Sequence, residues 1–285
     1  MGQSKYAVKD TPQDQLAYAL EFYEAEEYEK AVNELRKLIR HYPRAREAAE
    51  AQYYLALNYE RLDRPMKAFR NYQTVLEKYP FSERTAQIVK RQYEIGNEIL
   101  DGKYKRNKFV SAVVGGDYNV IEIFRTVIKN APYGGHAAPA QYKIGLYLLQ
   151  KRMYQEARDE FEKTINDYPD SEWVKAARYQ IAVSDAKRSA GAEYNQSVTQ
   201  AAIDEFKDFV KTNPDAELSD AAKAQIQDLR EKEAENSFIV AQFYEKQKKD
   251  QAAKICYSEI VDQYKDTSWA SKALEKIREI SGRTP

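Results

Sequence analysis

The sequence has few of the residues that build turns, disulfides and membrane spans. Its 10 glycines and 9 prolines make up about 7% of 285 residues, where average usage is roughly 12%, which disfavours a turn-rich all-β fold. The single cysteine, Cys256, excludes an internal disulfide and any zinc site that needs several cysteines. No stretch approaches 18 consecutive apolar residues, so no transmembrane helix is predicted. The 45 basic and 45 acidic residues cancel, and this balance does not favour a nucleic-acid partner.

The residues that are abundant favour a helical protein with a substantial core. Hydrophobic residues make up 43% of the chain, which is too many for intrinsic disorder. Ala, Glu, Lys, Gln, Leu and Arg are frequent, and all of them favour helices. Tyrosine is unusually common, with 23 residues against 10 phenylalanines and 2 tryptophans. The length predicts one or two domains.

An internal repeat organises the chain. Its mark is a small residue, a large apolar residue four positions later, and a proline twelve positions after the small residue. We count six repeats, four of which carry the full mark: Ala31-Leu35-Pro43, Ala68-Tyr72-Pro80, Ala157-Phe161-Pro169 and Ala202-Phe206-Pro214. Two variants keep the spacing: Val120-Phe124-Pro132, and Ala253-Tyr257-Lys265, which has lysine in place of the proline. Twelve residues before the alanine, four repeats carry a small residue at which a partner helix must come close: Ala19, Ala56, Gly145 and Ala241.

This pattern resembles the tetratricopeptide repeat. In that family each repeat is a helical hairpin that cannot bury its apolar face alone, so neighbouring hairpins stack. The proline ends each hairpin because it cannot continue a helix. The resemblance implies an all-α, tetratricopeptide-repeat superhelical solenoid of about six hairpins with a C-terminal capping helix. The tryptophan position of the family is occupied here by Gln15, Gln52, Gln92 and Gln141.

The spacing of the repeats predicts the organisation of the chain. Residues 1–12 are expected to form a flexible N-terminal segment. Residues 13–134 hold repeats one to three, with an insertion at about 101–116, and residues 135–285 hold repeats four to six and the cap. A run from Ser219 to Gln247 without glycine or proline predicts one long helix, and the cap at 268–280 is expected to bury Leu274, Ile277 and Ile280.

No constellation of residues predicts catalysis. His41 and His136 are interpreted as exposed turn residues, since neither has a second ligand at metal-binding spacing. Cys256 is interpreted as a small buried hydrophobic residue. The sequence has no phosphate-binding loop and no nucleophile motif. We therefore predict that the chain is not an enzyme and holds no cofactor and no metal.

Recognition of a peptide is the function that remains. In a tetratricopeptide stack, the first helix of each hairpin lines the concave groove. The groove candidates are Leu16, Leu20, Tyr23, Tyr53, Leu57, Arg61, Tyr93 and Asn97. Tyrosine offers rigid apolar area with a polar tip, which suits gripping a peptide. The alternative stays open that many of these tyrosines only pack one hairpin against the next.

A narrower resemblance lies in the last repeat. The stretch from Leu229 to Tyr264, with Phe238-Ile239-Val240-Ala241-Gln242-Phe243-Tyr244, resembles the C-terminal repeat of the BamD family. These are tetratricopeptide lipoproteins of the outer-membrane β-barrel assembly (BAM) machine. The first two repeats, with Tyr42-Pro43 and Tyr79-Pro80, are similar to the N-terminal half of that family. The family usually has five repeats and a lipidated N-terminal cysteine, whereas this chain has six repeats and lacks that cysteine.

The resemblance implies a non-enzymatic scaffold at the periplasmic face of a Gram-negative outer membrane. The N-terminal repeats would accept segments of unfolded outer-membrane proteins. The C-terminal repeats would dock the periplasmic POTRA domain of BamA, beside other components of the machine, through Phe243, Tyr244, Lys246, Lys248 and Lys249. Contact with the membrane would run only through an N-terminal lipid anchor absent from this chain, and no nucleic acid would be bound.

Two other classes of function stay open. One is a periplasmic or cytosolic tetratricopeptide scaffold or coordinator unrelated to the assembly machine. The other is an accessory domain cut from a larger polypeptide that carries an enzyme elsewhere. The segment from Met1 to Lys5 has no apolar signal core. It fits a cytosolic start or a chain whose targeting segment has been removed, so a cytoplasmic location stays open.

Overall fold

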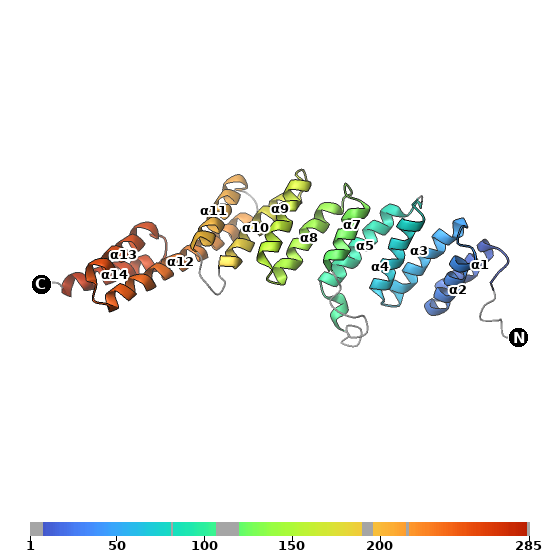
Figure 1. Cartoon of the computed structure of the whole chain (residues 1–285), viewed down its shortest axis with the longest axis horizontal. Coiled ribbons are helices and arrows are strands. Elements are labelled where there is room, and N and C mark those ends of the chain that lie inside the picture. The colour runs from blue at the N-terminus through green and yellow to red at the C-terminus, as the bar shows by residue number, and fades with distance from the viewer. Residues whose placement is uncertain (1–7, 81, 107–119, 190–195, 215–216, 284–285) are drawn as a thin grey trace. The chain divides into compact units, whose positions relative to one another are not determined.

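The computed structural model describes residues 8–80, 82–106, 120–189, 196–214 and 217–283, and these residues contain helices and no strand. The chain divides into two compact units, residues 1–140 and 141–285. Each unit is a stack of antiparallel helical hairpins (Figure 1). The expected all-α tetratricopeptide solenoid is therefore confirmed.

The first unit holds three hairpins. They are formed by α1 (Pro12–Glu24) with α2 (Tyr28–His41), α3 (Arg46–Arg61) with α4 (Pro65–Lys78), and α5 (Thr85–Leu100) with α7 (Val120–Asn130). A short 3-10 helix, η1 (Lys103–Arg106), follows α5 and occupies the start of the expected insertion. The rest of that insertion, including Lys108, lies outside the described residues.

The second unit holds the remaining hairpins. They are formed by α8 (Ala137–Gln150), whose residues from Gln141 onwards belong to this unit, with α9 (Tyr154–Asp167), by α10 (Trp173–Ser189) with α11 (Gln196–Thr212), and by α12 (Glu217–Lys246) with α13 (Asp250–Gln263). A final helix, α14 (Ser268–Arg283), packs on α13 and α12. The long helix that the sequence predicted is thus α12, which has 30 residues.

The repeated small and aromatic residues form the cores of the hairpins. Tyr72, Phe161 and Tyr257, one from each of three repeats, all have 0% exposure. The close approach of helices that the sequence predicted at Gly145 is confirmed, and the structure shows a second one at Gly96. A Cβ atom added to Gly145 would lie 2.5 Å from Cε1 of Phe161, and one added to Gly96 would lie 2.8 Å from Cε1 of Phe124. At these positions the aromatic ring of the second helix occupies the space that a side chain on the first helix would need.

The turn inside a hairpin repeats the same backbone conformation four times. Glu26, Asp63, Arg152 and Lys248 have φ values of 59°, 55°, 62° and 57°, in the left-handed region. In the first turn the Glu26 N–H donates to the carbonyl of Tyr23 and the Glu27 N–H to that of Phe22. This is the Schellman arrangement, which satisfies the last carbonyls of a helix and usually has glycine at the left-handed position. Here the left-handed position holds charged residues in place of glycine, and their side chains are exposed to solvent.

Glutamine at the family's tryptophan position ties the two helices of a hairpin together. The Nε2 atom of Gln141 donates to the backbone carbonyl of Glu160 at 3.1 Å and to its carboxylate at 2.7 Å. Gln15 and Gln52 make the equivalent pair of bonds to Glu34 and Asn71. All three glutamines have 5% exposure or less, so these bonds lie in the hairpin interior.

The third repeat departs from this arrangement for a reason that the sequence shows. The residue before Phe124, at the place of Glu160, is the apolar Ile123, which offers no side-chain acceptor. Gln92 instead donates to Gln73 at 3.0 Å and accepts from Asn130 at 2.9 Å. The amide is still satisfied, but through a link from α5 to α4 and to the end of α7.

Replacing Gln141 by leucine is expected to destabilise the second unit by about 1–2 kcal/mol, because the carboxylate and the carbonyl of Glu160 each lose one buried hydrogen bond. The measurement is urea unfolding followed by circular dichroism. Gln150→Leu is the matched control, since Gln150 is exposed at the end of the same helix. Equal changes in the two variants would contradict a stabilising role for the buried amide.

The capping helix buries two of its three expected residues. Ile280 is fully buried and Ile277 packs against the core, as predicted, but Leu274 is 40% exposed. Ala273 takes the buried position instead, with 0% exposure. Ala273 belongs to the core of the last hairpin, and Leu274, one residue along the helix, faces solvent.

Candidate protein-binding surfaces

Aromatic and basic side chains of α1 and α3 meet on one surface of the first unit. The ring of Tyr23 lies 5.5 Å from that of Tyr54 and 5.9 Å from that of Tyr28. Arg61 is hydrogen-bonded to Tyr23, and this bond raises the pKa of the guanidinium. We call Tyr23, Tyr54 and Arg61, together with the half-buried Leu16, Leu20 and Leu57 on the same helices, the tyrosine surface.

Tyr53 has a different place from the one that the sequence predicted for it. Its side chain is only 5% exposed, and its ring lies 5.8 Å from that of Tyr72. The guanidinium of Arg84 covers it at 4.2 Å, and burial raises the pKa of its hydroxyl. Tyr53 therefore packs inside its own hairpin and is covered by Arg84, the residue that precedes α5. The neighbouring Tyr54 is half-buried and meets Tyr23, and its spacing with Leu57 and Arg61 along one helix face could have revealed it.

Tyr93 and Asn97 lie apart from that cluster, on α5. The Tyr93 ring stacks on His136 at 4.9 Å and contacts Phe124 at 5.9 Å. His136 is consequently half-buried, and its interpretation as an exposed turn residue is wrong. Asn97 bonds to Tyr93, while its Oδ1 atom is buried without a partner.

A charged network links α3, which carries part of the tyrosine surface, to α4 and α5. Arg91 on α5 bonds to Glu60 on α3 at 2.7 Å and to Glu94 and Glu98 at 3.0 and 3.1 Å. Glu60 also accepts from the hydroxyl of the buried Tyr72 on α4. The guanidinium of Arg91 therefore joins α5 to α3, and the carboxylate of Glu60 extends the network to α4.

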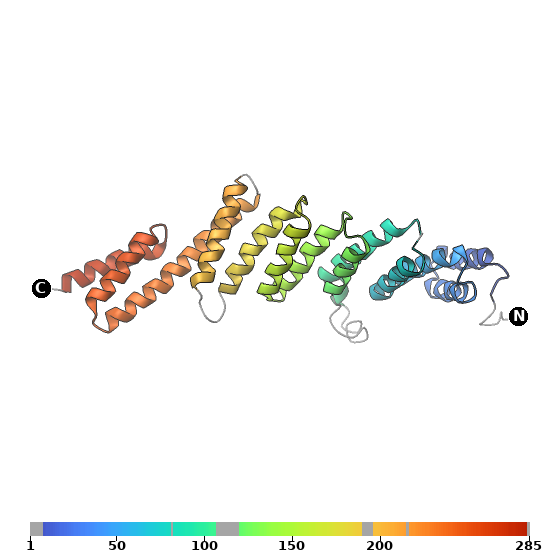
Figure 2. The same cartoon turned by 45° about the horizontal axis from the view of Figure 1, so that its top comes forward.

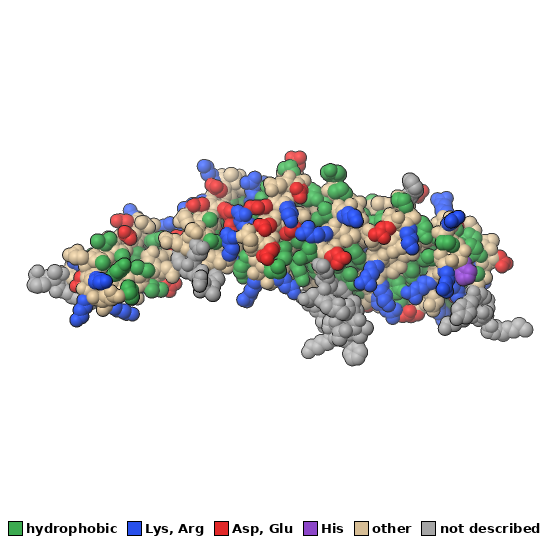
Figure 3. Space-filling view, viewed as in Figure 1, with side chains coloured by type: hydrophobic (Ala, Val, Ile, Leu, Met, Phe, Trp, Pro, Cys, Tyr) green, Lys and Arg blue, Asp and Glu red, His purple; other side chains and the backbone are tan. Residues whose placement is uncertain are grey.

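The second unit exposes apolar side chains on its long helix. Ile239, Val240 and Phe243 of α12 are 55%, 50% and 56% exposed. Their spacing places them on one helix face, which we call the C-terminal apolar face. Figure 3 shows hydrophobic side chains at the surface of this C-terminal hairpin. Contiguous exposed apolar area of this kind is typical of binding surfaces.

The length of α12 explains why none of the described neighbouring helices covers the C-terminal apolar face. Its first half buries Ala222 and Leu229 against α11, and its second half buries Phe238 and Ala241 against α13 and α14. At 1.5 Å per residue, its 30 residues extend about 45 Å, beyond the reach of the 17-residue α11. The last hairpin thus stands clear of the preceding one (Figure 2), and no described helix covers the C-terminal apolar face.

The other predicted docking residues surround this face. Tyr244 is half-buried, with its ring 5.9 Å from that of Phe243, and packs on the core of the last hairpin. Lys246, Lys248 and Lys249 are exposed, the last two in the turn between α12 and α13. An apolar centre with a polar rim is the usual layout of a protein-binding surface, and here the polar side chains nearby include three lysines.

The described residues contain no group of three histidine, cysteine, aspartate or glutamate side chains arranged to hold a metal ion. Cys256 is half-buried beside the last core, and burial raises the pKa of its thiol, so it stays protonated at neutral pH. Among the same residues, no helix combines the length and apolar content needed to cross a bilayer.

Comparison with protein families confirms both resemblances. Residues 182–283 match the YfiO (BamD) family, described as an outer membrane lipoprotein, and residues 50–82 and 139–171 match the tetratricopeptide repeat. The YfiO match contains the whole of α12, α13 and α14, and with them the C-terminal apolar face. Both are families of non-catalytic scaffolds.

Solved structures with similar chains are also tetratricopeptide proteins. The C-terminal part of such a protein from Cytophaga hutchinsonii is 14% identical, with a TM-score of 0.39, over 94% of this chain and 88% of that one. One from Parabacteroides merdae is 13% identical, with a TM-score of 0.36, over 95% and 98%. One from Thermus thermophilus is 15% identical, with a TM-score of 0.37, over 76% and 99%. None of the curated proteins matches this sequence.

Proposed function

We propose that this chain is a scaffold of the outer-membrane β-barrel assembly machine, at the periplasmic face of a Gram-negative outer membrane. The observation that carries the proposal is that the outer membrane lipoprotein match covers the hairpin whose apolar face has no partner. In this proposal the C-terminal apolar face and its lysines dock the POTRA domain of BamA. The first unit, residues 1–140, is the peptide-binding half, and the second is the partner-docking half.

The tyrosine surface is proposed to hold segments of unfolded outer-membrane proteins. Strands of such proteins alternate apolar and polar residues, with aromatic girdles at the membrane interfaces. Tyrosine rings that present apolar faces and polar tips suit both kinds of side chain. Arg61 adds an exposed cation at the edge of this surface.

Replacing both Tyr54 and Arg61 by alanine is expected to weaken capture of such a segment at least tenfold, because interface hot spots are enriched in tyrosine and arginine. The probe is a labelled peptide that spans one strand of an outer-membrane protein, and the readout is fluorescence anisotropy. Circular dichroism of the variant should be unchanged.

Two further variants make this experiment decisive. Tyr53→Ala is expected to reduce stability more than affinity, because that ring is packed between Tyr72 and Arg84. Arg70→Ala, which removes an exposed cation of α4, should change neither. If the Tyr54 and Arg61 double variant binds the peptide as the parent protein does, the tyrosine surface is not the peptide site.

A further inference from the structure

The first helix of a hairpin has one face that receives the second helix of the hairpin before it. Counted from the small residue in the core of the hairpin, this receiving face holds the residues five before, one before and two after it, which lie on one side of a helix. In α3 the small residue is Ala56. The helix that packs on this side is α2, and the three residues are at most 4% exposed: Ala51, Leu55 and Asn58.

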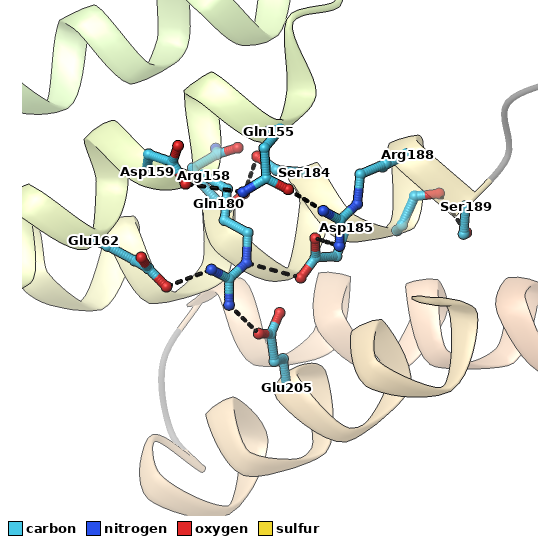
Figure 4. A network of polar contacts seen from close by, with 11 residues as sticks. Gln155, Arg158, Asp159, Glu162, Gln180, Ser184, Asp185, Arg188, Ser189 and Glu205 are labelled. Carbon is cyan, nitrogen blue, oxygen red and sulfur yellow. Dashed lines mark hydrogen bonds and ion pairs between the residues drawn. The ribbon is translucent and has the colours of Figure 1, made fainter. Parts of the chain in front are cut away.

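The second unit shows the same arrangement with α9 and α10. α9 packs on the receiving face of α10, whose residues are at most 8% exposed: Ala177, Ile181 and Ser184, counted from Ala182. Arg158 of α9 donates to Asp185 of α10 at 3.0 Å and also bonds to Glu205 of α11 (Figure 4). Gln155 of α9 accepts a hydrogen bond from Arg188 of α10. A receiving face under a helix is therefore buried, with polar contacts along its edge.

The receiving face of α1 has a different composition, because no described helix comes before α1 to cover it. Counted from Ala19, it holds Asp14, Tyr18 and Glu21, and both acidic side chains are exposed. Charged residues are expected here, since the end of a solenoid needs a polar outer face to stay in solution. α1 therefore shows which residues this chain places on a receiving face that remains in contact with water.

The second half of α12 has an apolar receiving face without a covering helix among the described residues. Counted from Ala241, the face holds Asn236, Val240 and Phe243, and the last two form part of the C-terminal apolar face. α11 packs only on the first half of α12. An aliphatic and an aromatic side chain thus occupy the positions at which α1 has tyrosine and glutamate. This face resembles the receiving faces that are buried under a helix, not the polar one of α1.

The pair of α2 and α3 also shows how a covering helix is directed. The two helices are antiparallel and joined by residues 42–45, so the first turn of α2 lies beside the end of α3. There Glu29, in the first turn of α2, pairs with Arg64 at 2.7 Å. Lys249 is equivalent to Arg64, since each lies eight residues after the small residue of its first helix. Lys249 is exposed, and within the described ranges no ion pair joins it to an acidic side chain.

We propose that the C-terminal apolar face binds an amphipathic α-helix of a partner protein, antiparallel to α12 and with a glutamate or aspartate in its first turn beside Lys249. Each of the second helices α2, α4, α9 and α13 has 14 residues, which sets the length of the bound helix. Its apolar stripe contacts Val240 and Phe243. This inference rests on the proposed docking role of this face, and it adds which element of the partner lies there.

Electrostatics favours this direction over the opposite one. An acidic residue in the first turn of a helix is stabilised by the helix dipole, and here it also meets a lysine. The reverse direction would place the negative end of the bound helix away from the three lysines at the end of α12. The ion pair is exposed, so it fixes the direction more than it adds affinity.

The test uses the labelled peptide acetyl-Ser-Glu-Glu-Ala-Leu-Ala-Lys-Leu-Ala-Ala-Lys-Leu-Ala-Lys-amide, whose leucines share one helix face. Its matched control has proline in place of the alanine after the central leucine, which keeps the apolar residues and breaks the helix. Fluorescence anisotropy with the full chain is expected to show saturable binding of the helical peptide, at least tenfold tighter than that of the control. Equal binding of the two peptides, or none at millimolar concentration, would overturn the proposal.

Variants of the chain locate the bound helix and its direction. Val240→Asp should weaken binding at least tenfold, whereas Ile255→Asp, at an exposed apolar position of α13, should leave it unchanged. Lys249→Glu should weaken binding about two- to threefold, as expected for an exposed ion pair. A peptide with lysines in place of its two glutamates should prefer the Lys249→Glu variant to the parent chain. The opposite preference would reverse the direction and overturn that part of the proposal.

Competition separates this inference from the proposed function. The helical peptide should displace the POTRA segment of BamA from the chain. If POTRA binds through Phe243 and the peptide neither binds nor competes, the docking role stands and the bound helix is wrong. If the peptide binds and POTRA does not, the bound helix stands and the assembly-machine partner is wrong. A dimer in sedimentation equilibrium that Val240→Asp dissociates, without peptide binding, would assign the face to a second copy of this chain instead.

Discussion

Replacing Gly145 by alanine is expected to destabilise the second unit by about 2 kcal/mol or more. The added Cβ would lie 2.5 to 2.8 Å from three atoms of the Phe161 ring. That ring cannot move aside easily, because Phe161 has 0% exposure and the Tyr142 ring packs on it at 5.4 Å. Overpacking of this kind costs about 1–3 kcal/mol and sometimes more. The better helix propensity of alanine returns at most about 1 kcal/mol.

Two comparisons separate this contact from a general effect of glycine in helices. Gly282→Ala in α14 places its Cβ where no atom lies within 4 Å, so that variant should be as stable as the parent or slightly more so. Adding Phe161→Leu to Gly145→Ala should recover part of the loss, because the smaller side chain vacates the ring's position. Urea unfolding followed by circular dichroism measures all four proteins. A Gly145→Ala variant as stable as Gly282→Ala would show that the helices can separate at no cost.

The hairpin core could be predicted from the sequence because the repeat reduces it to a few spacings. A small residue sixteen positions before a large one recurs in four repeats, and both positions are buried each time, as at Ala56 and Tyr72. The packing of helical hairpins requires a small residue and a large residue at these two positions, so the same pair recurs along the chain. In α14, by contrast, the pattern of apolar residues does not show which of the neighbours Ala273 and Leu274 is buried. The structure buries Ala273.

The polar contacts could not be predicted in the same way. Gln141 meets Glu160 through side-chain geometry rather than through a hydrophobic pattern. Arg158 and Glu205 are 47 residues apart, on helices of two different repeats, and the repeat spacing does not pair the two positions. Charged side chains are common on any solvated helix face, so the sequence alone does not distinguish these partners from the rest.

The candidate surfaces show the same limit. Tyr53 and Tyr54 are neighbours in sequence and their rings are in contact, yet Tyr53 is buried against Tyr72 while Tyr54 is half-buried and meets Tyr23, a difference that the sequence does not show. Phe243 was predicted as a docking residue because the segment that contains it resembles the BamD family. Its exposure depends on how far α12 extends past α11, which a single sequence does not state. The insertion of the third repeat adds nothing here, since residues 107–119 lie outside the described residues.

Replacing Phe243 by aspartate is expected to weaken binding to the POTRA segment of BamA by about a hundredfold. A buried aromatic anchor contributes roughly 2–4 kcal/mol to an interface, and each 1.4 kcal/mol is a factor of ten. The side chain is 56% exposed in the free protein, so the substitution should not reduce stability. Val240→Asp, on the same face, should act in the same direction. Calorimetry at moderate salt, with the POTRA segment from the same organism, measures the affinity.

Two sets of variants outside the apolar face serve as controls for this experiment. Tyr133→Asp removes an aromatic side chain that is 100% exposed but lies in the first unit, so it should leave the affinity unchanged. Replacing Lys246, Lys248 and Lys249 by glutamine should lower the association rate and its dependence on salt more than the dissociation rate, because exposed rim charges act mainly on encounter. If the parent chain binds POTRA and the Phe243 and Val240 variants bind equally well, the docking surface lies elsewhere. If the parent chain does not bind at tens of micromolar, a tetratricopeptide scaffold outside the assembly machine becomes the better explanation, because exposed apolar side chains grouped on one helix face are typical of binding surfaces for other partners too.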